Sequence, residues 1–354
     1  MGWTKLKYSK NQIDKSGKFL VASNTTPDQK GGSMDILNNW RSSHSFPLWV
    51  FTFRLRDLAR KINPNAIVVR RLKRIPSILK KLQRGQTSTM DMSQMQDIAG
   101  CRAVMNDIGE VNKLLDIYKK RDKGLYHKLK NKKDYIQFPK NDGYRSVHLI
   151  YKYLSSKNEE YNGLLIEIQI RTKLQHYWAT AIETVDHFTK QAIKSNEGEK
   201  DWIDFFKLVS SAFAYMESVP LVPDTPIDQK ELKNQIQELS GKLKVAKKMR
   251  EWTRFHKSIE VFEKNSKVKY DFYLLNLDLG TRETQITGYF KNQEELANSE
   301  YSKHEERMLA NKEKDRDIVL VSAETIKELR KAYPNYFLDA REFIKVLNTY
   351  FKNQ

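Results

Sequence analysis

The amino-acid sequence predicts a fold that combines α-helices with β-strands, in the α/β or α+β class. Residues 147–153 and 164–171 alternate apolar with polar side chains, which is typical of strands with one buried face. Apolar residues at helical spacing precede these strands at 34–61 and follow them at 176–187. Because strands and helices alternate along the chain, we expect a sheet flanked by helices.

The composition favours a globular protein with a polyanionic partner. The chain has 354 residues, 39% hydrophobic and 30% charged, which is enough for two domains. Its 63 Lys and Arg against 44 Asp and Glu give a net charge of +19, which favours nucleic acid or nucleotide phosphates as partners. A basic surface with no partner is the alternative.

Cysteine content and hydropathy indicate a cytoplasmic location. Cys101 is the single cysteine, so neither an intrachain disulfide nor a cysteine-based metal cluster is expected. No apolar run approaches the roughly 20 residues that cross a bilayer, and the first residues lack the apolar core of a signal peptide. We therefore expect no membrane association.

The chain divides into three predicted parts. Residues 1–33 suggest a short helix and then a flexible crossing at Gly31 and Gly32. Apolar residues from Leu232 to Phe262, at steps of three and four, predict one long amphipathic helix. The predicted domains are residues 1–220, a linker helix at 221–268, and a small α/β unit at 269–354 that we call the C-terminal unit.

A polar loop lies between two predicted strands. Residues 134–138 are predicted to form a short strand, which Pro139 and Gly143 end before the strand at 147–153 begins. Lys140, Asp142 and Tyr144 would therefore lie on the connecting loop. An ordinary hairpin turn explains the segment equally well.

The strand at 164–171 carries an unusual polar row. Glu167, Gln169 and Arg171 share one face, opposite the isoleucines. An edge strand with a solvated face is the alternative, but such a face needs no acid, amide and base in register. Beside the loop around Tyr144, this row resembles the floor of a phosphate site.

A basic run at 68–82 predicts an anion site at the start of a helix. Pro76 suits the first turn, and Ser77 and Lys81 then share one helix face. Arg71 and Lys73 come just before it, so free backbone N–H groups would be surrounded by cations. A solvated basic face is the alternative.

Asp97 interrupts the apolar strand predicted at 95–105. A carboxylate at the mouth of a strand, opposite Glu167 in a phosphate site, suits Mg²⁺, which prefers one or two carboxylates plus phosphate oxygens. A structural ion pair with Arg102 is the alternative. His176 and Glu183 share a helix face, but without a third ligand we expect them to support structure rather than to bind zinc.

Together these motifs resemble the synthetase domain of the RelA/SpoT family, whose members move pyrophosphate from ATP to a nucleotide 3′-hydroxyl. The resemblance covers about residues 71–183 and implies a mixed β-sheet flanked by helices. No Gly-x4-Gly-Lys-Ser/Thr loop is present, which argues against the common NTPase class. The family pattern appears as Arg71, Lys73, Ser77 and Lys81, then Asp97 and Arg102, then Lys140, Tyr144 and His148, then Glu167, Gln169 and Arg171.

The resemblance also implies a role for each of these residues. Asp97 and Glu167 would hold Mg²⁺, and Glu167 would accept the proton of the 3′-hydroxyl. Arg71 and Arg102 would sandwich adenine, and Tyr144 would stack on the acceptor base. The phosphates of ATP would contact Lys73, Ser77 and Lys81, and the acceptor would also contact Lys140, His148, Gln169 and Arg171.

Two further stretches, Asn38–His44 and Tyr333–Asp339, look like the toxic small alarmone synthetases with a fused antitoxin, the CapRel type. This implies pyrophosphate transfer to the 3′-CCA end of tRNA, inhibition of translation in phage defence, and a phage protein that triggers the enzyme through the C-terminal unit. Tyr333 and Tyr336 would inhibit the enzyme by placing rings between Arg71 and Arg102. The alternative is that the two tyrosines anchor a turn in the core of the small domain.

Two departures from the family pattern bear on the acceptor. Asn131 stands where guanosine-phosphate binders tend to have a basic residue, and Asp142 replaces an asparagine of the loop. Both weaken the case for an anionic guanosine 5′-phosphate, although Lys132 and Lys133 can compensate. The alternatives are a (p)ppGpp or (p)ppApp alarmone synthetase acting on free GDP, GTP or adenine nucleotides, and a basic RNA-binding module without activity.

Overall fold

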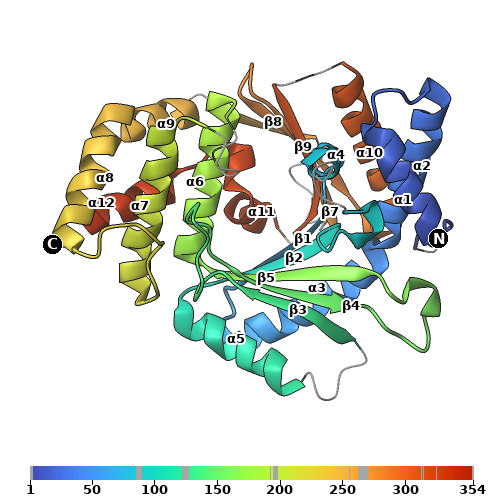
Figure 1. Ribbon diagram of the computed structural model, residues 1–354, viewed down its shortest axis with the longest axis horizontal. Coiled ribbons are helices and arrows are strands. Elements are labelled where there is room, and N and C mark those ends of the chain that lie inside the picture. Colours follow the sequence, from blue (N-terminus) through green and yellow to red (C-terminus); the bar gives the residue numbers. More distant parts are fainter. Residues whose placement is uncertain are drawn as a thin grey trace.

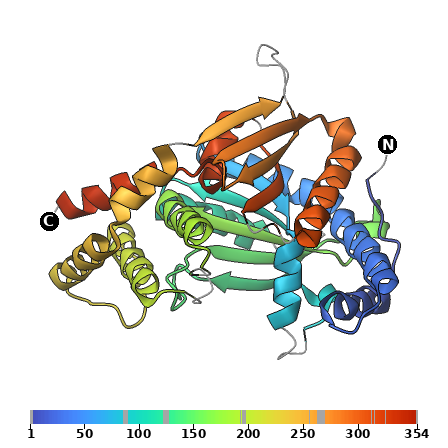
Figure 2. The ribbon, with the colours of Figure 1, turned by 90° about the horizontal axis from the view of Figure 1, so that it is seen from above.

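The computed structural model describes residues 3–84, 90–121, 127–191, 193, 198–254, 256–261, 270–311, 313, 315–323 and 325–352. Within these residues, nine strands form one sheet in the order β3-β4-β5-β2-β1-β9-β7-β8-β6, with helices packed around it (Figures 1 and 2). No helix of this described part combines the length and the apolar character needed to cross a membrane.

Five strands of the first half form the part of the sheet that carries the predicted site. β2 and β5 run parallel, whereas the pairs β1–β2, β4–β5 and β3–β4 are antiparallel, so the mixed α+β fold is confirmed. The strands are β1 (Ile67–Leu72), β2 (Ala99–Met105), β3 (Lys128–Asp134), β4 (Val147–Lys152) and β5 (Leu165–Thr172).

Seven helices accompany these strands among the described residues. The flexible crossing predicted at Gly31 and Gly32 is wrong, because one helix runs through both glycines from Pro27. Thr26 and Gln29 form a capping box at its start, and this start signal outweighs the cost of two glycines. The helices are α1 (Lys10–Val21), α2 (Pro27–Ser43), α3 (Ser45–Ile62), α4 (Ile75–Arg84), α5 (Ile108–Arg121), α6 (Lys173–Thr189) and α7 (Lys200–Glu217).

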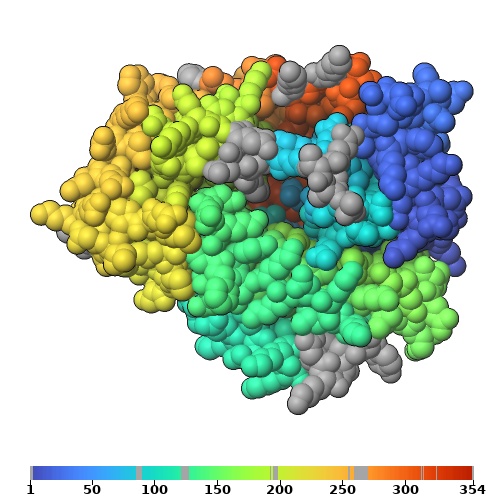
Figure 3. Space-filling model, viewed as in Figure 1, coloured from blue at the N-terminus to red at the C-terminus, as the bar shows by residue number. Residues whose placement is uncertain are grey.

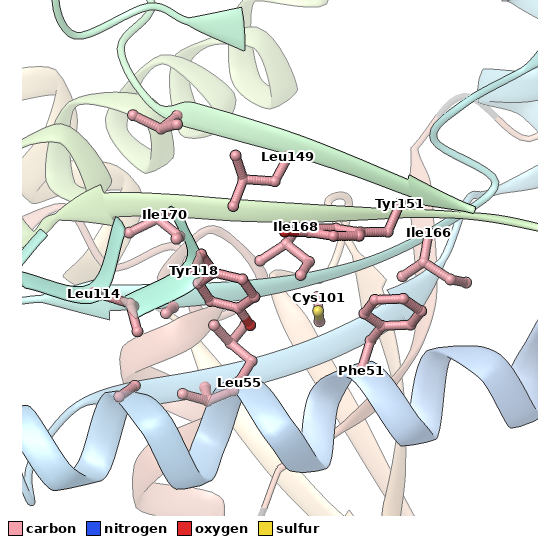
Figure 4. Packing of buried hydrophobic residues seen from close by; sticks show 14 of the residues in the cluster. Phe51, Leu55, Cys101, Leu114, Tyr118, Leu149, Tyr151, Ile166, Ile168 and Ile170 are labelled. Atoms are coloured by element: carbon pink, nitrogen blue, oxygen red, sulfur yellow. The ribbon is translucent and has the colours of Figure 1, made fainter. Parts of the chain in front are cut away.

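The main core lies between helix α3 and one face of the sheet. Phe51 and Leu55 pack towards Ile166 and Ile168, which are fully buried (Figure 4). Cys101 lies in the same core, and burial raises the pKa of its thiol to about 12. The isoleucine face of β5 is thus filled, and its polar face is left for the site.

The long helix predicted from Leu232 to Phe262 is interrupted. Lys244 takes a left-handed conformation with φ 52°, which ends one helix and starts the next. Both helices are amphipathic, and the apolar spacing continues across the break. The sequence pattern therefore does not reveal that the helix ends there. The segment contains α8 (Gln229–Leu243), α9 (Val245–Arg254) and the strand β6 (Lys257–Val261); residues 255 and 262 lie outside the described part.

The C-terminal unit extends the same sheet. β9 pairs antiparallel with β1, with Arg70 opposite Ser322 and Arg71 opposite Val321. The division into domains stays a prediction. The elements are β7 (Phe272–Asp278), β8 (Glu283–Tyr289), α10 (Glu294–Ala310), β9 (Arg316–Ser322), α11 (Ile326–Ala332) and α12 (Arg341–Lys352); short 3-10 turns are η2 (Met92–Gln94), η4 (Glu159–Tyr161), η6 (Lys291–Gln293) and η7 (Pro334–Phe337).

Buried ionic contacts join helix α10 to α2 and α4, which lie beside it (Figure 2). Glu305 forms an ion pair with Arg41, and both side chains are 1% exposed. Its other oxygen accepts a hydrogen bond of 2.8 Å from the backbone N–H of Ile75, the first residue of α4. A carboxylate of the C-terminal unit therefore caps the helix predicted to bind phosphates.

Glu305→Ala should destabilise the protein by about 3–5 kcal/mol, because it leaves the guanidinium of Arg41 buried without its partner. Urea denaturation followed by circular dichroism measures the free energy of unfolding. Glu295→Ala, an exposed change on the same helix, is the matched control and should shift it by less than about 0.5 kcal/mol. Equal effects of the two changes would contradict a structural role for the pair.

Candidate active site

A cavity of about 260 Å³ lies over the polar face of β1, β2, β4 and β5. Figure 3 shows a hollow on this side of the molecule, between the cyan segment that contains α4 and the green residues near 140. Its lining brings together most of the predicted residues: Arg71, Lys73, Asp97, Arg102, Lys140, Tyr144, His148, Glu167, Gln169 and Arg171, with Val69, Gly100, Cys101, Asp142, Glu183 and Tyr333.

Strand register explains this convergence. Arg102 of β2 lies opposite Gln169 of β5, which in turn lies opposite His148 of β4. Residues two apart on a strand share a face, so Glu167 and Arg171 project on the same side as Gln169. The alternation predicted for β5 is confirmed, and the alternative of a solvated edge strand is wrong, because β5 is paired on both sides.

Glu167 is held as a carboxylate at the floor of the cavity. His148 Nδ1 lies 2.8 Å from Oε1, and the amide of Gln169 donates to Oε2 at 2.6 Å. Burial alone would raise the pKa of Glu167, but the hydrogen bonds from His148 and Gln169 hold it below the usual value. An ionised, oriented carboxylate is the state needed for a cation or for accepting a proton.

Asp97 precedes β2 and carries the second carboxylate. Its two oxygens each lie 2.9 Å from a lysine nitrogen, one of Lys73 and one of Lys81. Burial opposes ionisation, yet the two ammonium groups lower the pKa of Asp97 to about 2. Asp97 therefore forms ion pairs with these two lysines and not with Arg102, the partner considered as an alternative.

Tyr333 of the C-terminal unit reaches into the cavity beside the two arginines. Its ring centroid lies 5.5 Å from the guanidinium carbon of Arg102, and only 2% of the residue is exposed. The nearby Arg71 and Arg102 charges act to lower the pKa of Tyr333, but burial has the larger effect and raises it.

Tyr336 does not line the cavity, so the prediction that both rings enter the space between the arginines is wrong for it. It packs among buried side chains of the C-terminal unit, and its hydroxyl oxygen accepts a bond of 3.3 Å from Arg74. Arg74 also pairs with Asp317 of β9. The 3-10 turn that begins at Pro334 sets the two rings edge to face, with centroids 6.4 Å apart, and only Tyr333 lines the cavity.

Tyr144 and His148 form a hydrogen-bonded chain to Glu167. The hydroxyl of Tyr144 lies 2.9 Å from His148 Nε2, and His148 donates from Nδ1 to the carboxylate of Glu167. Lys140 Nζ lies 5.3 Å from the centroid of the Tyr144 ring. Asp142 accepts a bond of 2.8 Å from the Tyr144 N–H and also lines the cavity.

The loop that carries these residues is held by a left-handed glycine. Gly143 has φ +87°, and a Cβ there would approach Ser210 of α7 within 2.9 Å. The strand predicted at 134–138 is wrong: β3 ends at Asp134, whose side chain accepts from the N–H groups of Ile136 and Gln137. This short-range bonding favours a turn.

Arg171 is buried, with 3% exposure, and lies at the cavity wall. Burial and the nearby Arg102 lower its pKa to about 9. One of its nitrogens donates to Nδ1 of His176, which supports the structural role predicted for that histidine. Glu183 lines the cavity on the same helix.

Three predicted residues do not line the cavity. Ser77 lies half-buried on α4, Lys81 reaches the site through Asp97, and Tyr336 contacts Arg74. Sequence reasoning missed Tyr135, whose ring centroid lies 4.8 Å from Lys140 Nζ. Its position directly after a strand of lysines was the available signal. Asn131 lies on β3, away from the lining residues.

Two ionised carboxylates among several cations, on the polar face of a mixed sheet, define a class of enzymes that handle phosphates. Residues 70–191 match the family described as "Region found in RelA / SpoT proteins". The GTP pyrophosphokinase YwaC of Bacillus subtilis (strain 168) is 33% identical over 161 residues, 41% of this chain and 73% of that protein. The chain belongs to the RelA/SpoT family, and the predicted resemblance to that family is confirmed.

Two further similarities cover part of this chain. The GTP pyrophosphokinase YjbM of the same organism is 33% identical over 141 residues, 39% of this chain. The chain spans 62% of the length of YjbM. The crystal structure of small alarmone synthetase 2 from Bacillus subtilis is 24% identical, covers 51% of this chain and 94% of that one, and superposes with a TM-score of 0.43.

Proposed function

We propose that this chain is an ATP-dependent pyrophosphokinase that transfers pyrophosphate to the 3′-hydroxyl of the tRNA CCA end. The observation that carries the reaction type is the pair of carboxylates, Asp97 and Glu167, facing one cavity that five cationic side chains also line. Such a site neutralises a polyphosphate while keeping two oxygen ligands ionised.

Mg²⁺ is the proposed cofactor. Among the described residues no three His, Cys, Asp or Glu side chains gather into a metal site. Asp97 and Glu167 nevertheless fit Mg²⁺, because it binds through one or two carboxylates and completes its shell with phosphate oxygens and water. When bound, it would neutralise charge on the transferred phosphates.

The ATP side is assigned to the β1 and α4 segment. Arg71 and Arg102 would stack on adenine, while Lys73 and Lys81 would exchange Asp97 for phosphate oxygens. Ser77, one turn before Lys81, would add a hydroxyl. On the opposite side, Glu167 would take the proton of the acceptor hydroxyl, and its place next to His148 keeps it oriented.

Two features favour tRNA over a free nucleotide as the acceptor. Asp142 puts a negative side chain beside Tyr144, which disfavours an anionic 5′-phosphate there. The edge strand β3, which ends before this loop, presents four exposed lysines along its length, a charge pattern that suits a nucleic-acid backbone. They are Lys128, Lys130, Lys132 and Lys133.

The second candidate is an alarmone synthetase that acts on GDP, GTP or adenine nucleotides. The relatives named GTP pyrophosphokinase favour it. Incubation with γ-labelled ATP and either tRNA or each nucleotide separates the two functions. Label on tRNA, absent when the 3′ end has been oxidised with periodate before the reaction, supports the first; label on nucleotides alone would replace it by the second.

The tRNA proposal predicts a steep salt dependence. Replacing both Lys128 and Lys130 by alanine should reduce the slope of log affinity against log salt by about 2, because each lysine neutralises one phosphate. Filter binding from 50 to 200 mM salt measures the slope. Alanine at Lys345 and Lys352, exposed on α12, should leave it unchanged. An unchanged slope in the β3 variant would remove β3 from the tRNA path.

The C-terminal unit is proposed to act as a fused antitoxin. Tyr333 occupies space beside Arg102 that adenine would need, so ATP binding requires its displacement. A phage protein that binds the C-terminal unit better in the displaced arrangement would activate the enzyme by population shift. The resulting modification of tRNA would stop translation in an infected cell.

A further inference from the structure

His176 lies between the candidate active site and the C-terminal unit. It is on the first turn of α6 and 1% exposed. Its Nδ1 faces Arg171, and its Nε2 lies 2.7 Å from the carbonyl oxygen of Lys331, two residues before Tyr333. One imidazole thus contacts both a wall of the cavity and the main chain that leads to the inhibitory ring.

The two partners fix the tautomer of the ring. A guanidinium can only donate, so Nδ1 must offer its lone pair to Arg171. A carbonyl can only accept, so Nε2 must carry the hydrogen that it donates to Lys331. Burial and the charges of Arg171 and Arg102 hold the pKa of His176 well below its usual value, which keeps the ring neutral.

We propose that His176 is a positioning residue for the acceptor side of the reaction, which orients Arg171 and takes its own orientation from the backbone of the C-terminal unit. With Lys331 in place, ring rotation would break two hydrogen bonds in a buried site. Arg171 is then presented to the cavity in one arrangement. This inference rests on the proposed function, because that function assigns Arg171 to acceptor binding.

A consequence is that the two sides of the site differ in the observed arrangement. Tyr333 obstructs the adenine side, whereas Arg171, His148 and Tyr144 are already hydrogen-bonded in place on the acceptor side. The inhibited protein should therefore bind its acceptor before ATP is admitted. Release of the C-terminal unit would open the adenine side and loosen Arg171.

Two variants of the full chain separate positioning from simple packing. Glutamine at position 176 has an oxygen that can accept from Arg171 and an amide that can donate to Lys331, whereas leucine has neither. His176→Leu should weaken binding of tRNA, measured without ATP, about tenfold, the effect of losing one hydrogen bond to a charged group. His176→Gln should stay within about threefold of the wild type.

Two further measurements complete the test. Nitrogen NMR of the wild-type chain, with labelled histidine, should show protonated Nε2 and unprotonated Nδ1 for His176. In the Tyr333→Ala background, binding of a non-hydrolysable ATP analogue should change less than about twofold on His176→Leu. Equal acceptor binding by the leucine and glutamine variants, or the opposite tautomer, would overturn the proposal. If these binding and NMR results hold but no pyrophosphate is transferred to tRNA, the proposed function is rejected and the positioning role of His176 is retained.

Discussion

Glu167→Gln is expected to lower pyrophosphate transfer by at least about 10²–10³-fold, the loss typical when one preorganised charge-stabilising group is removed. The amide keeps the size of the side chain and an oxygen for His148, but it removes the negative charge that a cation and the acceptor proton require. Asp97→Asn should have a comparable effect, because the negative charge beside Lys73 and Lys81 disappears. Transfer from labelled ATP measures both.

Thermal unfolding distinguishes loss of chemistry from loss of fold. Both carboxylates face the cavity rather than the apolar core, so the two variants should unfold near the wild-type temperature. Glu159→Gln, an exposed change in η4, is the matched control and should retain full activity. Turnover at the wild-type rate in the Glu167 and Asp97 variants would show that the carboxylates do not serve the reaction.

Tyr333→Ala is expected to raise the basal transfer rate at least about tenfold, because the alanine cannot fill the space beside Arg102. The cation–π contact that it removes is of roughly 0.5–2 kcal/mol. Tyr333→Phe keeps the ring and should stay inhibited. Tyr336→Phe, which removes only the hydroxyl near Arg74, is the matched control and should also stay inhibited.

The single substitution is a cleaner test than deletion of residues 269–354 or replacement of both tyrosines. Deletion would uncover the edge of β1 and remove Glu305, Ser302 and Tyr301, which all contact Arg41, so the remaining half would lose stability as well as Tyr333. Tyr336 belongs to the core of the C-terminal unit. A basal rate that stays unchanged in Tyr333→Ala would assign the ring to packing alone.

Local patterns in the sequence predicted the strands and helices that carry the site. The alternation at 164–171 gave β5 with its polar face, and motif order placed Asp97, Glu167 and Tyr144 at one cavity. Such patterns repeat every two residues in a strand, so a short window suffices to identify them. The same window fails at Lys244, because two amphipathic helices in succession look like one.

Contacts between distant segments left no comparable mark. The pair of Arg41 with Glu305 joins residues 264 positions apart, and the pairing of β9 with β1 is made by main-chain groups. The partner of a buried arginine or of an edge strand cannot be identified from a single sequence. For the same reason the direction of Tyr336, set by Arg74 and the core around it, was predicted wrongly.

The pairing of β1 with β9 has a consequence for which contacts give the junction its specificity. Arg70 and Arg71 meet Ser322 and Val321 through backbone groups, which every amino acid except proline supplies alike. The backbone pairing alone therefore fixes no partner sequence, and specificity of the C-terminal unit for the first half rests with side chains such as Glu305, Asp317 and Tyr333.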